Sequence, residues 1–440
     1  MNLLSLISSC LFLSLTLISI PLNSAQCIDQ PYPTQPNIKL ASKCLLVKKQ
    51  PMKNVNYQVQ NDTNMFVIQF NCEIKDITRC AKVKSSFEEA GLIISSTLIL
   101  NTPILINAKF REMESAGILG AAGPYRTMPM KDDDGFERLY PQSLVKQFQL
   151  SVHPEFAPVD IIADFNSLIP FWFEGDPPIT SQQIGFLELI IHELMHGLGF
   201  ASSWNVYLDN FPEAATPEIV GLTTGTTLPD LNAKFVFNGF QESAFDKYLI
   251  LLPENKLISS YANELNKFAD FGTTYENAFD FLNQFVVSPQ FLVAKEIFSY
   301  FIKPKDLVFK PSVSDKEEDM TYLETSLNPY RPGSSISHVD SLTYTNTSEF
   351  LMTFSQEKGR TLNDNIRIGG NYAGGAIGHK LRLILESLGY ATKESPNYKS
   401  PSPPDLPFNE DLNSSSWNNF SYKFYHTFVV GITIIMINYL

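Results

Sequence analysis

Basic residues and histidines are both scarce in this chain. Lysine and arginine number 33 against 46 aspartates and glutamates, which leaves a formal net charge of -13. A surface of this sign argues against nucleic acid and against anionic membrane surfaces as partners. Only 6 of the 440 residues are histidine, so a histidine motif is unexpected by chance. Hydrophobic residues make up 44% of the chain, enough for one large domain with additions or for two domains.

Cysteine is also rare. Of the 5 cysteines, Cys10 lies in the apolar run at the N-terminus, and the other four lie before residue 81. These four are Cys27, Cys44, Cys72 and Cys80. An even number of cysteines outside that run suits an oxidising compartment. Four cysteines allow three pairings, of which short loops favour Cys27–Cys44 with Cys72–Cys80, although spacing alone does not decide between them.

Both ends of the chain predict export. Residues 1–25 are typical of a secretory signal peptide, with cleavage near Ser24 or Ala25, and a membrane-spanning helix is the weaker alternative because no basic flank follows. Residues 26–60 form an N-terminal segment, and the sequence leaves open whether it is a propeptide.

The C-terminal end predicts a lipid anchor. A Pro/Ser-rich stalk at 393–416 ends in three small residues, Ser414, Ser415 and Ser416. A spacer and the apolar tail 428–440 follow, so residues 417–440 are typical of a GPI-attachment signal that is removed, with a tail anchor as the alternative. Glycosylation sequons occur at Asn61, Asn346, Asn413 and Asn419. We expect a protein of the secretory pathway, held on the outer face of the cell membrane or in the cell wall.

Between the ends, residues 61–392 mix two periodicities and predict an α+β domain. Alternating apolar residues indicate strands at 64–70, 103–112 and 159–167. Helical periodicity indicates helices at 85–100, 242–253, 294–302 and 374–390, the last ending at Gly389. A further helix follows residues 176–183, where Thr180 and Gln183 could form a capping box.

That further helix contains the sequence HELMH, from His192 to His196. Its two histidines are four residues apart, so their imidazoles project from one helical face and can bind one metal ion. Zinc suits neutral imidazole nitrogens, and a catalytic site keeps one position open for water. Glu193 can take a proton from that water as it attacks a peptide carbonyl, and return it to the leaving amine.

Gly199 lets the helix end sharply, because glycine accepts a left-handed backbone. The pattern of two histidines, glutamate and this glycine resembles the metzincin zinc peptidases. Ser202 departs from the pattern, since it stands where a third histidine is expected. Leishmanolysin-like metzincins carry a large insertion at this point, and secreted fungal proteins of that type are the most similar.

The resemblance implies a metzincin-like domain with a twisted mixed sheet, an active-site helix and a large, mainly helical insertion at about residues 203–335. It implies that His338 is the third ligand and that Met352 forms the methionine turn beneath the metal. The other histidines fit less well: His153 precedes the motif helix, His379 lies in the late helix and His426 lies in the removed tail.

The sequence therefore predicts a surface-anchored endopeptidase with one catalytic Zn²⁺ and polypeptide substrates. Two alternatives stay open. One is an inactive adhesion or binding protein on a metallopeptidase scaffold, which the retained Glu193 argues against. The other is a gluzincin, in which Glu213 or Glu218 would be an acidic third ligand.

Overall fold

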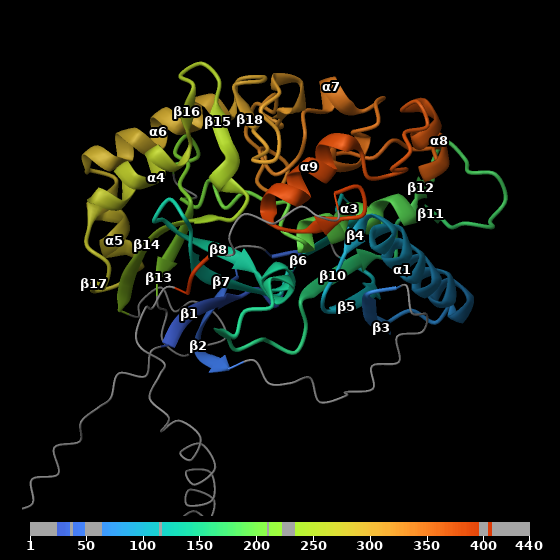
Figure 1. Cartoon of the computed structure of the whole chain (residues 1–440), viewed down its shortest axis with the longest axis horizontal. Helices are drawn as coiled ribbons and strands as arrows, with labels where there is room; N and C mark the ends of the chain where they lie inside the picture. The colour runs from blue at the N-terminus through green and yellow to red at the C-terminus, as the bar shows by residue number, and fades with distance from the viewer. Residues whose placement is uncertain are drawn as a thin grey trace, which may run out of the picture. The chain divides into compact units, whose positions relative to one another are not determined.

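The motif helix lies beside a four-stranded sheet, three of whose strands the alternating pattern predicts. In this computed structural model the strands run in the order β3 (Phe66–Cys72), β5 (Ile104–Arg111), β10 (Ile161–Asn166) and β6 (Gly120–Pro124) (Figure 1). β3 and β10 both run parallel to β5, and β6 is an antiparallel edge strand. Every residue of β10 is buried, as expected for a strand covered on both faces. The three predicted strands are confirmed.

The structure describes residues 24–35, 38–48, 64–113, 117–208, 211–221, 234–395 and 404–406. All of them except Leu406 belong to one compact unit, Met1–Asp405. Within the described part of the chain, no helix is long and apolar enough to cross a bilayer. Most of the signal peptide, Asn61, Asn413, Asn419, the candidate anchor serines, the apolar tail and most of the stalk lie outside the described residues.

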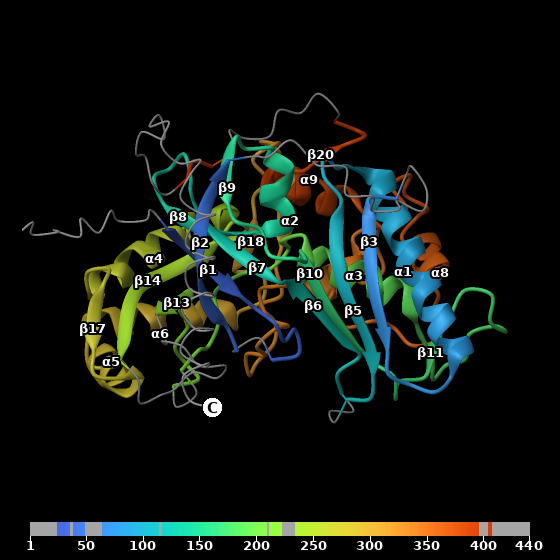
Figure 2. The ribbon, with the colours of Figure 1, turned by 90° about the horizontal axis from the view of Figure 1, so that it is seen from below.

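Two long helices pack together beside this sheet. Helix α1 (Ile77–Thr97) begins earlier than predicted, because the side chain of Asp76 accepts a hydrogen bond from the backbone N–H of Arg79. It also ends earlier, since the next residues form the short strand β4 (Leu98–Ile99), which pairs with β20 (Ala391–Thr392). Figure 2 shows α1 along the outer side of this sheet.

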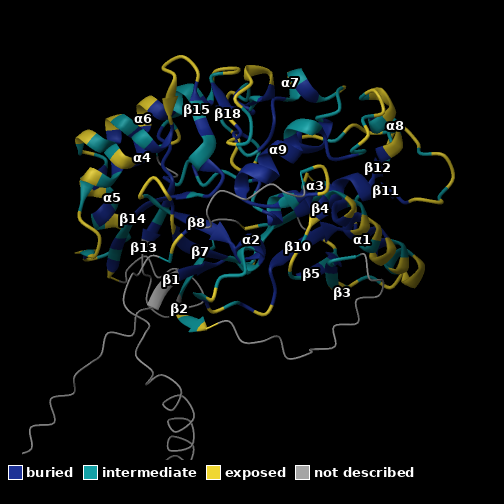
Figure 3. Cartoon of the chain, viewed as in Figure 1, coloured by how far each residue is buried: buried dark blue, intermediate teal, exposed yellow. Residues whose placement is uncertain are grey.

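The motif helix is α3 (Phe186–Gly197), and it contacts both α1 and β6. The capping prediction for Thr180 is wrong, because the helix begins after Gly185 without a side-chain cap. Instead, Gln183 Oε1 accepts hydrogen bonds from the backbone N–H and hydroxyl of Thr180 and closes a separate turn. Figure 3 shows that α3 is largely buried, whereas α5 and α8 present exposed faces.

A second sheet has eight strands and takes in the N-terminal segment. Its order is β13 (Glu218–Gly221), β14 (Phe235–Ser243), β8 (Glu137–Pro141), β7 (Arg126–Lys131), β1 (Ser24–Asp29), β2 (Leu40–Lys48) and β9 (Val152–Pro154), with β17 (Thr273–Tyr275) also paired to β14. β1 is therefore an interior strand, paired to β2 on one side and β7 on the other.

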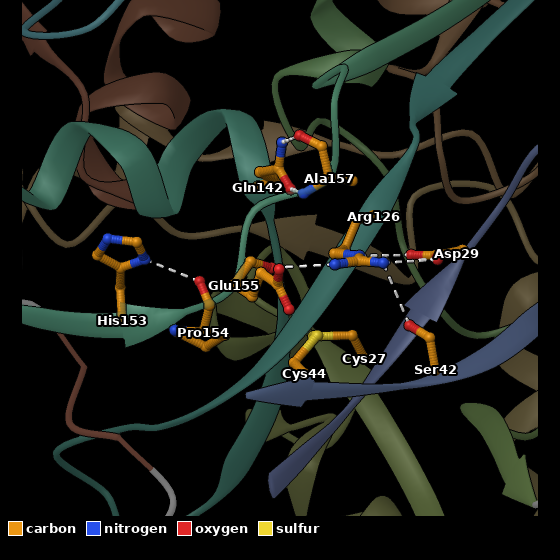
Figure 4. The surroundings of a disulfide bond; sticks show 10 residues. All are labelled: Cys27, Asp29, Ser42, Cys44, Arg126, Gln142, His153, Pro154, Glu155 and Ala157. Carbon is orange, nitrogen blue, oxygen red and sulfur yellow. Dashed lines mark hydrogen bonds and ion pairs between the residues drawn. A yellow bond between two sulfur atoms is a disulfide. The ribbon is translucent and has the colours of Figure 1, made fainter. Parts of the chain in front are cut away.

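Two disulfides join the predicted partners, Cys27–Cys44 and Cys72–Cys80. The first links β1 to β2, and Figure 4 shows Arg126 of β7 beside it. The Arg126 guanidinium donates to both carboxylate oxygens of Asp29, at 2.6 and 2.7 Å. The N-terminal strands are thus fixed covalently to each other and electrostatically to the rest of the sheet.

The insertion is mixed rather than mainly helical. Besides β13, β14 and β17 it contains β15 (Leu249–Leu251), β16 (Lys256–Leu257), β18 (Leu307–Phe309), β19 (Thr321–Tyr322), α4 (Ser259–Leu265), α5 (Ala278–Phe285) and α6 (Pro289–Phe301). The helix predicted at 294–302 overlaps the second half of α6, which begins earlier and ends at Phe301, but the helix predicted at 242–253 is wrong. There β14 ends, a short 3₁₀ turn follows and β15 begins. The carboxylate of Asp246 accepts hydrogen bonds from the backbone N–H groups of Ser203 and Ser243, which offers this segment an alternative to a helix.

The late helix is α9 (His379–Leu388), which starts five residues later than predicted and ends as predicted at Gly389, where φ is +123°. The remaining elements are α2 (Gln142–Val145), β11 (Phe171–Trp172), β12 (Ile184–Gly185), α7 (Ser341–Tyr344) and α8 (Leu362–Ile368), with short 3₁₀ turns between them. The α+β class is confirmed.

Candidate metal centre

Three imidazoles from distant parts of the chain converge on one point. The Nε2 atoms of His192 and His196 are 3.2 Å apart, and His338 Nε2 lies 3.2 Å from the first and 3.3 Å from the second. Among the described residues these three form the group of side chains that could hold a metal ion. Sequence reasoning named all three.

The other nitrogen of each ring is bonded to a backbone carbonyl. The Nδ1 atoms of His192, His196 and His338 lie 2.7, 2.7 and 2.9 Å from the carbonyl oxygens of Leu351, Phe200 and Ser334. A carbonyl only accepts, so each Nδ1 carries the proton and each Nε2 presents a lone pair. Three lone pairs facing one another at this distance repel, and a cation between them removes that repulsion. Carbonyls on the second nitrogen are a common way to orient metal-binding histidines.

Burial keeps these rings neutral. Burial lowers the pKa of His192. Burial, and to a smaller extent the charge of His192, lowers the pKa of His196 to about 3. Burial and both neighbours lower the pKa of His338 well below the usual value. Neutral imidazole is the metal-binding form, so the cluster is ready to bind at neutral pH.

The end of α3 sets the orientation of His196. Gly199 has a φ of +108°, and the backbone N–H of Phe200 folds back onto the carbonyl of Met195 at 3.1 Å. This turn places the carbonyl of Phe200 against His196 Nδ1. A Cβ at Gly199 would lie 3.0 Å from Cγ of Pro141, so glycine is needed for both conformation and space. The predicted helix-ending role of Gly199 is confirmed.

Ser202, which stands at the place of a third histidine, has a structural role. Its hydroxyl donates to the buried Asp246 carboxylate at 2.6 Å, and its backbone N–H donates to the Ser337 hydroxyl at 3.2 Å. Asp246 belongs to the insertion, and Ser337 precedes His338. The serine therefore ties the chain leaving α3 to both the insertion and the loop that carries His338.

The segment around Met352 supports the cluster from the other side. Met352 is 1% exposed and lies in a 3₁₀ turn that contacts α3. Its backbone carbonyl accepts from the N–H of Val339, next to His338, and the carbonyl of its neighbour Leu351 accepts from His192. This short turn thus accepts hydrogen bonds both from the backbone next to His338 and from the imidazole of His192.

Glu193 faces the edge strand of the smaller sheet. One of its carboxylate oxygens accepts a hydrogen bond from the backbone N–H of Ala122 in β6, at 2.8 Å. The residue is 7% exposed, and burial raises the pKa of its carboxyl to about 7. A carboxyl with a pKa near neutrality can accept and return a proton with little free-energy cost in either direction.

A cleft of about 570 Å³ opens over these groups, bordered by β6, α3, the segment after Met352 and the N-terminal segment. Three residues that sequence reasoning missed, Glu188, Lys39 and Tyr207, line it. Glu188 lies one turn before His192, a spacing that could have revealed it. Lys39 and Glu218 form an ion pair in the same cleft, and the hydroxyl of Tyr207 donates to Glu218 at 2.9 Å. No local signal marks Lys39, because its partner lies far along the chain.

The other candidate residues lie outside the histidine group. Glu213 is ion-paired with Lys295 at 3.3 Å, and neither Glu213 nor Glu218 belongs to the histidine group. His153 stacks on Phe156, and His379 is bonded to Asp319 at 3.0 Å. Asn346 is exposed, with its side-chain oxygen accepting from Arg360. His426 lies outside the described residues.

Comparison with known proteins gives a family but no activity. The SPBPB7E8-like family matches residues 27–419, which is most of the chain. The chain belongs to the SPBPB7E8-like family. The chain is 28% identical over 375 residues to an uncharacterized protein of Schizosaccharomyces pombe. The alignment covers 76% of this chain and 64% of that protein. The chain thus spans less than two thirds of that relative's length. No solved structure matches it.

Proposed function

We propose that this protein is a zinc-dependent endopeptidase of the metzincin type, similar to the leishmanolysin-like branch. The observation that carries the proposal is the triangle of Nε2 atoms, with edges of 3.2, 3.2 and 3.3 Å. Tetrahedral zinc with Zn–N distances of about 2.0–2.1 Å separates its nitrogen ligands by about 3.3–3.4 Å. Three neutral imidazoles fit zinc, and three protein ligands leave a fourth position for chemistry.

The residues around the cluster supply the remaining steps. Zinc, when bound, supplies Lewis acidity for the attack of water on a peptide carbonyl. Glu193 takes the proton from the attacking water and delivers it to the leaving amine, and its near-neutral pKa suits both transfers. The hydrogen bond from Ala122 holds one carboxylate oxygen in place while the other stays available.

The border of the cleft suits a polypeptide substrate. β6 pairs with β10 along one edge, and it is the last strand of its sheet. Residues 120–124 of this strand line the cleft next to Glu193. An extended peptide can bind to such an edge through backbone hydrogen bonds, which do not depend on its side chains.

The decisive experiment compares the Glu193→Gln variant with the wild type. Zinc content should stay the same, because the three ligands are untouched, while cleavage of a quenched fluorescent casein falls by at least about a hundredfold. Metal content by mass spectrometry and the initial rate of fluorescence increase are the measurements. Glu89→Gln, an exposed carboxylate on α1, is the matched control and should cleave normally.

Two outcomes would reject the proposal. Wild-type protein that binds zinc but cleaves nothing would favour a binding protein on a peptidase scaffold. Equal rates in the wild type and Glu193→Gln, at equal zinc content, would remove Glu193 from the chemistry.

We also propose that the enzyme is attached to the cell surface by a GPI anchor, on the basis of the C-terminal sequence. Phosphatidylinositol-specific phospholipase C should release it from intact cells, and deletion of residues 428–440 should send it to the medium. Retention after lipase treatment, with the apolar tail still present in the mature protein, would indicate a tail anchor.

A further inference from the structure

Glu188 is a carboxylate in the cleft that the proposed mechanism does not use. It lies four residues before His192 on α3, so both side chains project from the same face of the helix. Four helical residues span about 6 Å along the axis, close to the length of two residues of an extended peptide. Glu188 lines the cleft together with His192 and Glu193. It is therefore within reach of a substrate side chain near the bond to be cleaved.

The surroundings of Glu188 do not neutralise its charge. The residue is 6% exposed, and among the described residues its hydrogen-bond partner is the neutral amide of Asn365, at 2.7 Å. Arg360 is near enough for its charge to act on Glu188, but its guanidinium donates to Asn346 at 3.0 Å. Arg360 and Glu188 form no ion pair within 4.0 Å. Burial raises the pKa of the Glu188 carboxyl to about 7. A buried carboxylate without a cation is costly, and a bound cation would lower that cost.

A second acceptor lies at the same end of the cleft. The side-chain amide of Gln356 donates to the carbonyl of Gly185, the residue that precedes α3, at 2.8 Å. Its Oε1 atom is buried and has no hydrogen-bond partner among the described residues. Gln356 also lines the cleft. The carboxylate and this amide oxygen both call for a donor, and ammonium and guanidinium groups carry several donors and no acceptor.

Another carboxylate that lines the cleft has different surroundings. Glu218 is already paired with the ammonium of Lys39 and accepts from Tyr207. Of the acidic side chains that line the cleft, Glu188 and Glu193 are thus the two without an ion-pair partner among the described residues. The net charge of -13 would also draw basic polypeptides toward the surface.

We infer that Glu188, with Gln356 beside it, forms a subsite for a lysine or arginine side chain of the substrate, within two residues of the cleaved bond. The inference rests on the proposed peptidase function and specifies its substrate class. Glu188 acts on specificity and takes no part in bond cleavage. The carboxylate supplies the charge, the amide of Asn365 holds it in place, and Gln356 Oε1 accepts from a second N–H of the cation.

The experiment uses peptide pairs that differ in charge alone. A library with fixed alanine flanks carries lysine, norleucine, arginine or citrulline at each position around the cleaved bond. For the wild type, kcat/KM should be about 30-fold higher for lysine than for norleucine at one position, as expected for a charge pair in a partly desolvated site. Glu188→Gln keeps the side-chain shape and the bond to Asn365, so this ratio should fall to between about 1 and 3, mainly through a lower kcat/KM for the lysine peptide.

Binding gives a readout that does not depend on turnover. In the zinc-loaded Glu193→Gln background, calorimetry should show the same preference for the lysine peptide over the norleucine peptide. Adding Glu188→Gln should abolish that preference. Asn365→Ala is the matched control, because it removes the hydrogen bond and keeps the charge. A purely structural role for Glu188 predicts that Asn365→Ala and Glu188→Gln act alike, whereas the subsite predicts that Asn365→Ala keeps most of the lysine preference.

The outcomes separate the two proposals. If the wild type neither cleaves nor binds any of these peptides, the proposed peptidase function is wrong. A wild type that cleaves peptides with equal kcat/KM for lysine and norleucine at every position overturns the subsite alone. So does a lysine preference that survives Glu188→Gln and Glu188→Ala, since the charge would then lie elsewhere.

Discussion

Removing His338 is the most informative perturbation of the candidate metal centre. This residue comes 142 positions after His196, and its ring closes the Nε2 triangle from a different part of the chain. It is 6% exposed and held by the carbonyl of Ser334, so it is oriented before metal binds. His338→Ala deletes one of three ligands and leaves α3, with its two histidines, in place.

The expected loss of zinc affinity follows from dividing the zinc-binding free energy among the three histidine nitrogens. A zinc site made of protein ligands is worth about 10–16 kcal/mol, so one of three similar nitrogens contributes about 4 kcal/mol. Since about 1.4 kcal/mol corresponds to a tenfold change in affinity, His338→Ala should raise the Kd for zinc by about a thousandfold. His192→Ala should have an effect of similar size.

The assay is a competition titration with a chromophoric chelator, followed by mass spectrometry of the dialysed protein. His153→Ala and His379→Ala are the controls, because the His153 ring stacks on Phe156 and the His379 ring is hydrogen-bonded to Asp319, and neither ring belongs to the cluster. Their zinc affinities should match the wild type. An unchanged affinity in His338→Ala, together with loss in Glu213→Ala or Glu218→Ala, would refute the assignment and favour an acidic third ligand.

Two further predictions concern the support of the site. Gly199→Ala should lower the free energy of unfolding by about 1–2 kcal/mol, because φ is +108° there, and should weaken metal binding by shifting the Phe200 carbonyl. The control is Gly175→Ala, with φ +88° and open space around it, which should lower stability without changing metal affinity. Equal metal affinities in the two variants would contradict this role of the turn at Gly199. Glu188→Gln should stabilise the metal-free protein in urea unfolding at pH 8 by about 3 kcal/mol, since the folded pKa of about 7 exceeds the usual 4.5 and ionisation then costs stability. That gain should shrink to under about 1 kcal/mol at pH 5, where the folded carboxyl is protonated, and a gain independent of pH would show that burial does not raise this pKa.

Local patterns in the sequence revealed the parts of the site that local forces build. The spacing of His192, Glu193 and His196 follows from the helical repeat, and Gly199 follows from the conformation needed to end the helix. His338 came from its order in the chain and from the resemblance. The short loops of the four cysteines likewise favoured the pairings that the structure has.

Features that depend on distant partners stayed hidden. The apolar residues at 242–253 suggested a helix, but pairing of Glu242 and Ser243 with β8, pairing of β15 with β16 and β18, and the bonds to Asp246 decide otherwise. The place of β1 inside a sheet depends on β7, about a hundred residues later. In the sequence, Glu188 looked like part of an ordinary buried helix. Its proposed role depends on the cleft that it lines together with the segment after Met352, which the local sequence does not reveal.

The separation of His338 from His192 and His196 along the chain also has a consequence for biosynthesis. At about 5–20 residues per second, the ribosome needs roughly 7–30 s to add the residues between His196 and His338. During that interval α3 can offer a metal ion only two imidazoles, so tight capture must wait until the whole insertion has been made and folded. The ion would then join two segments whose contact is costly in chain entropy, so its binding would stabilise the folded insertion.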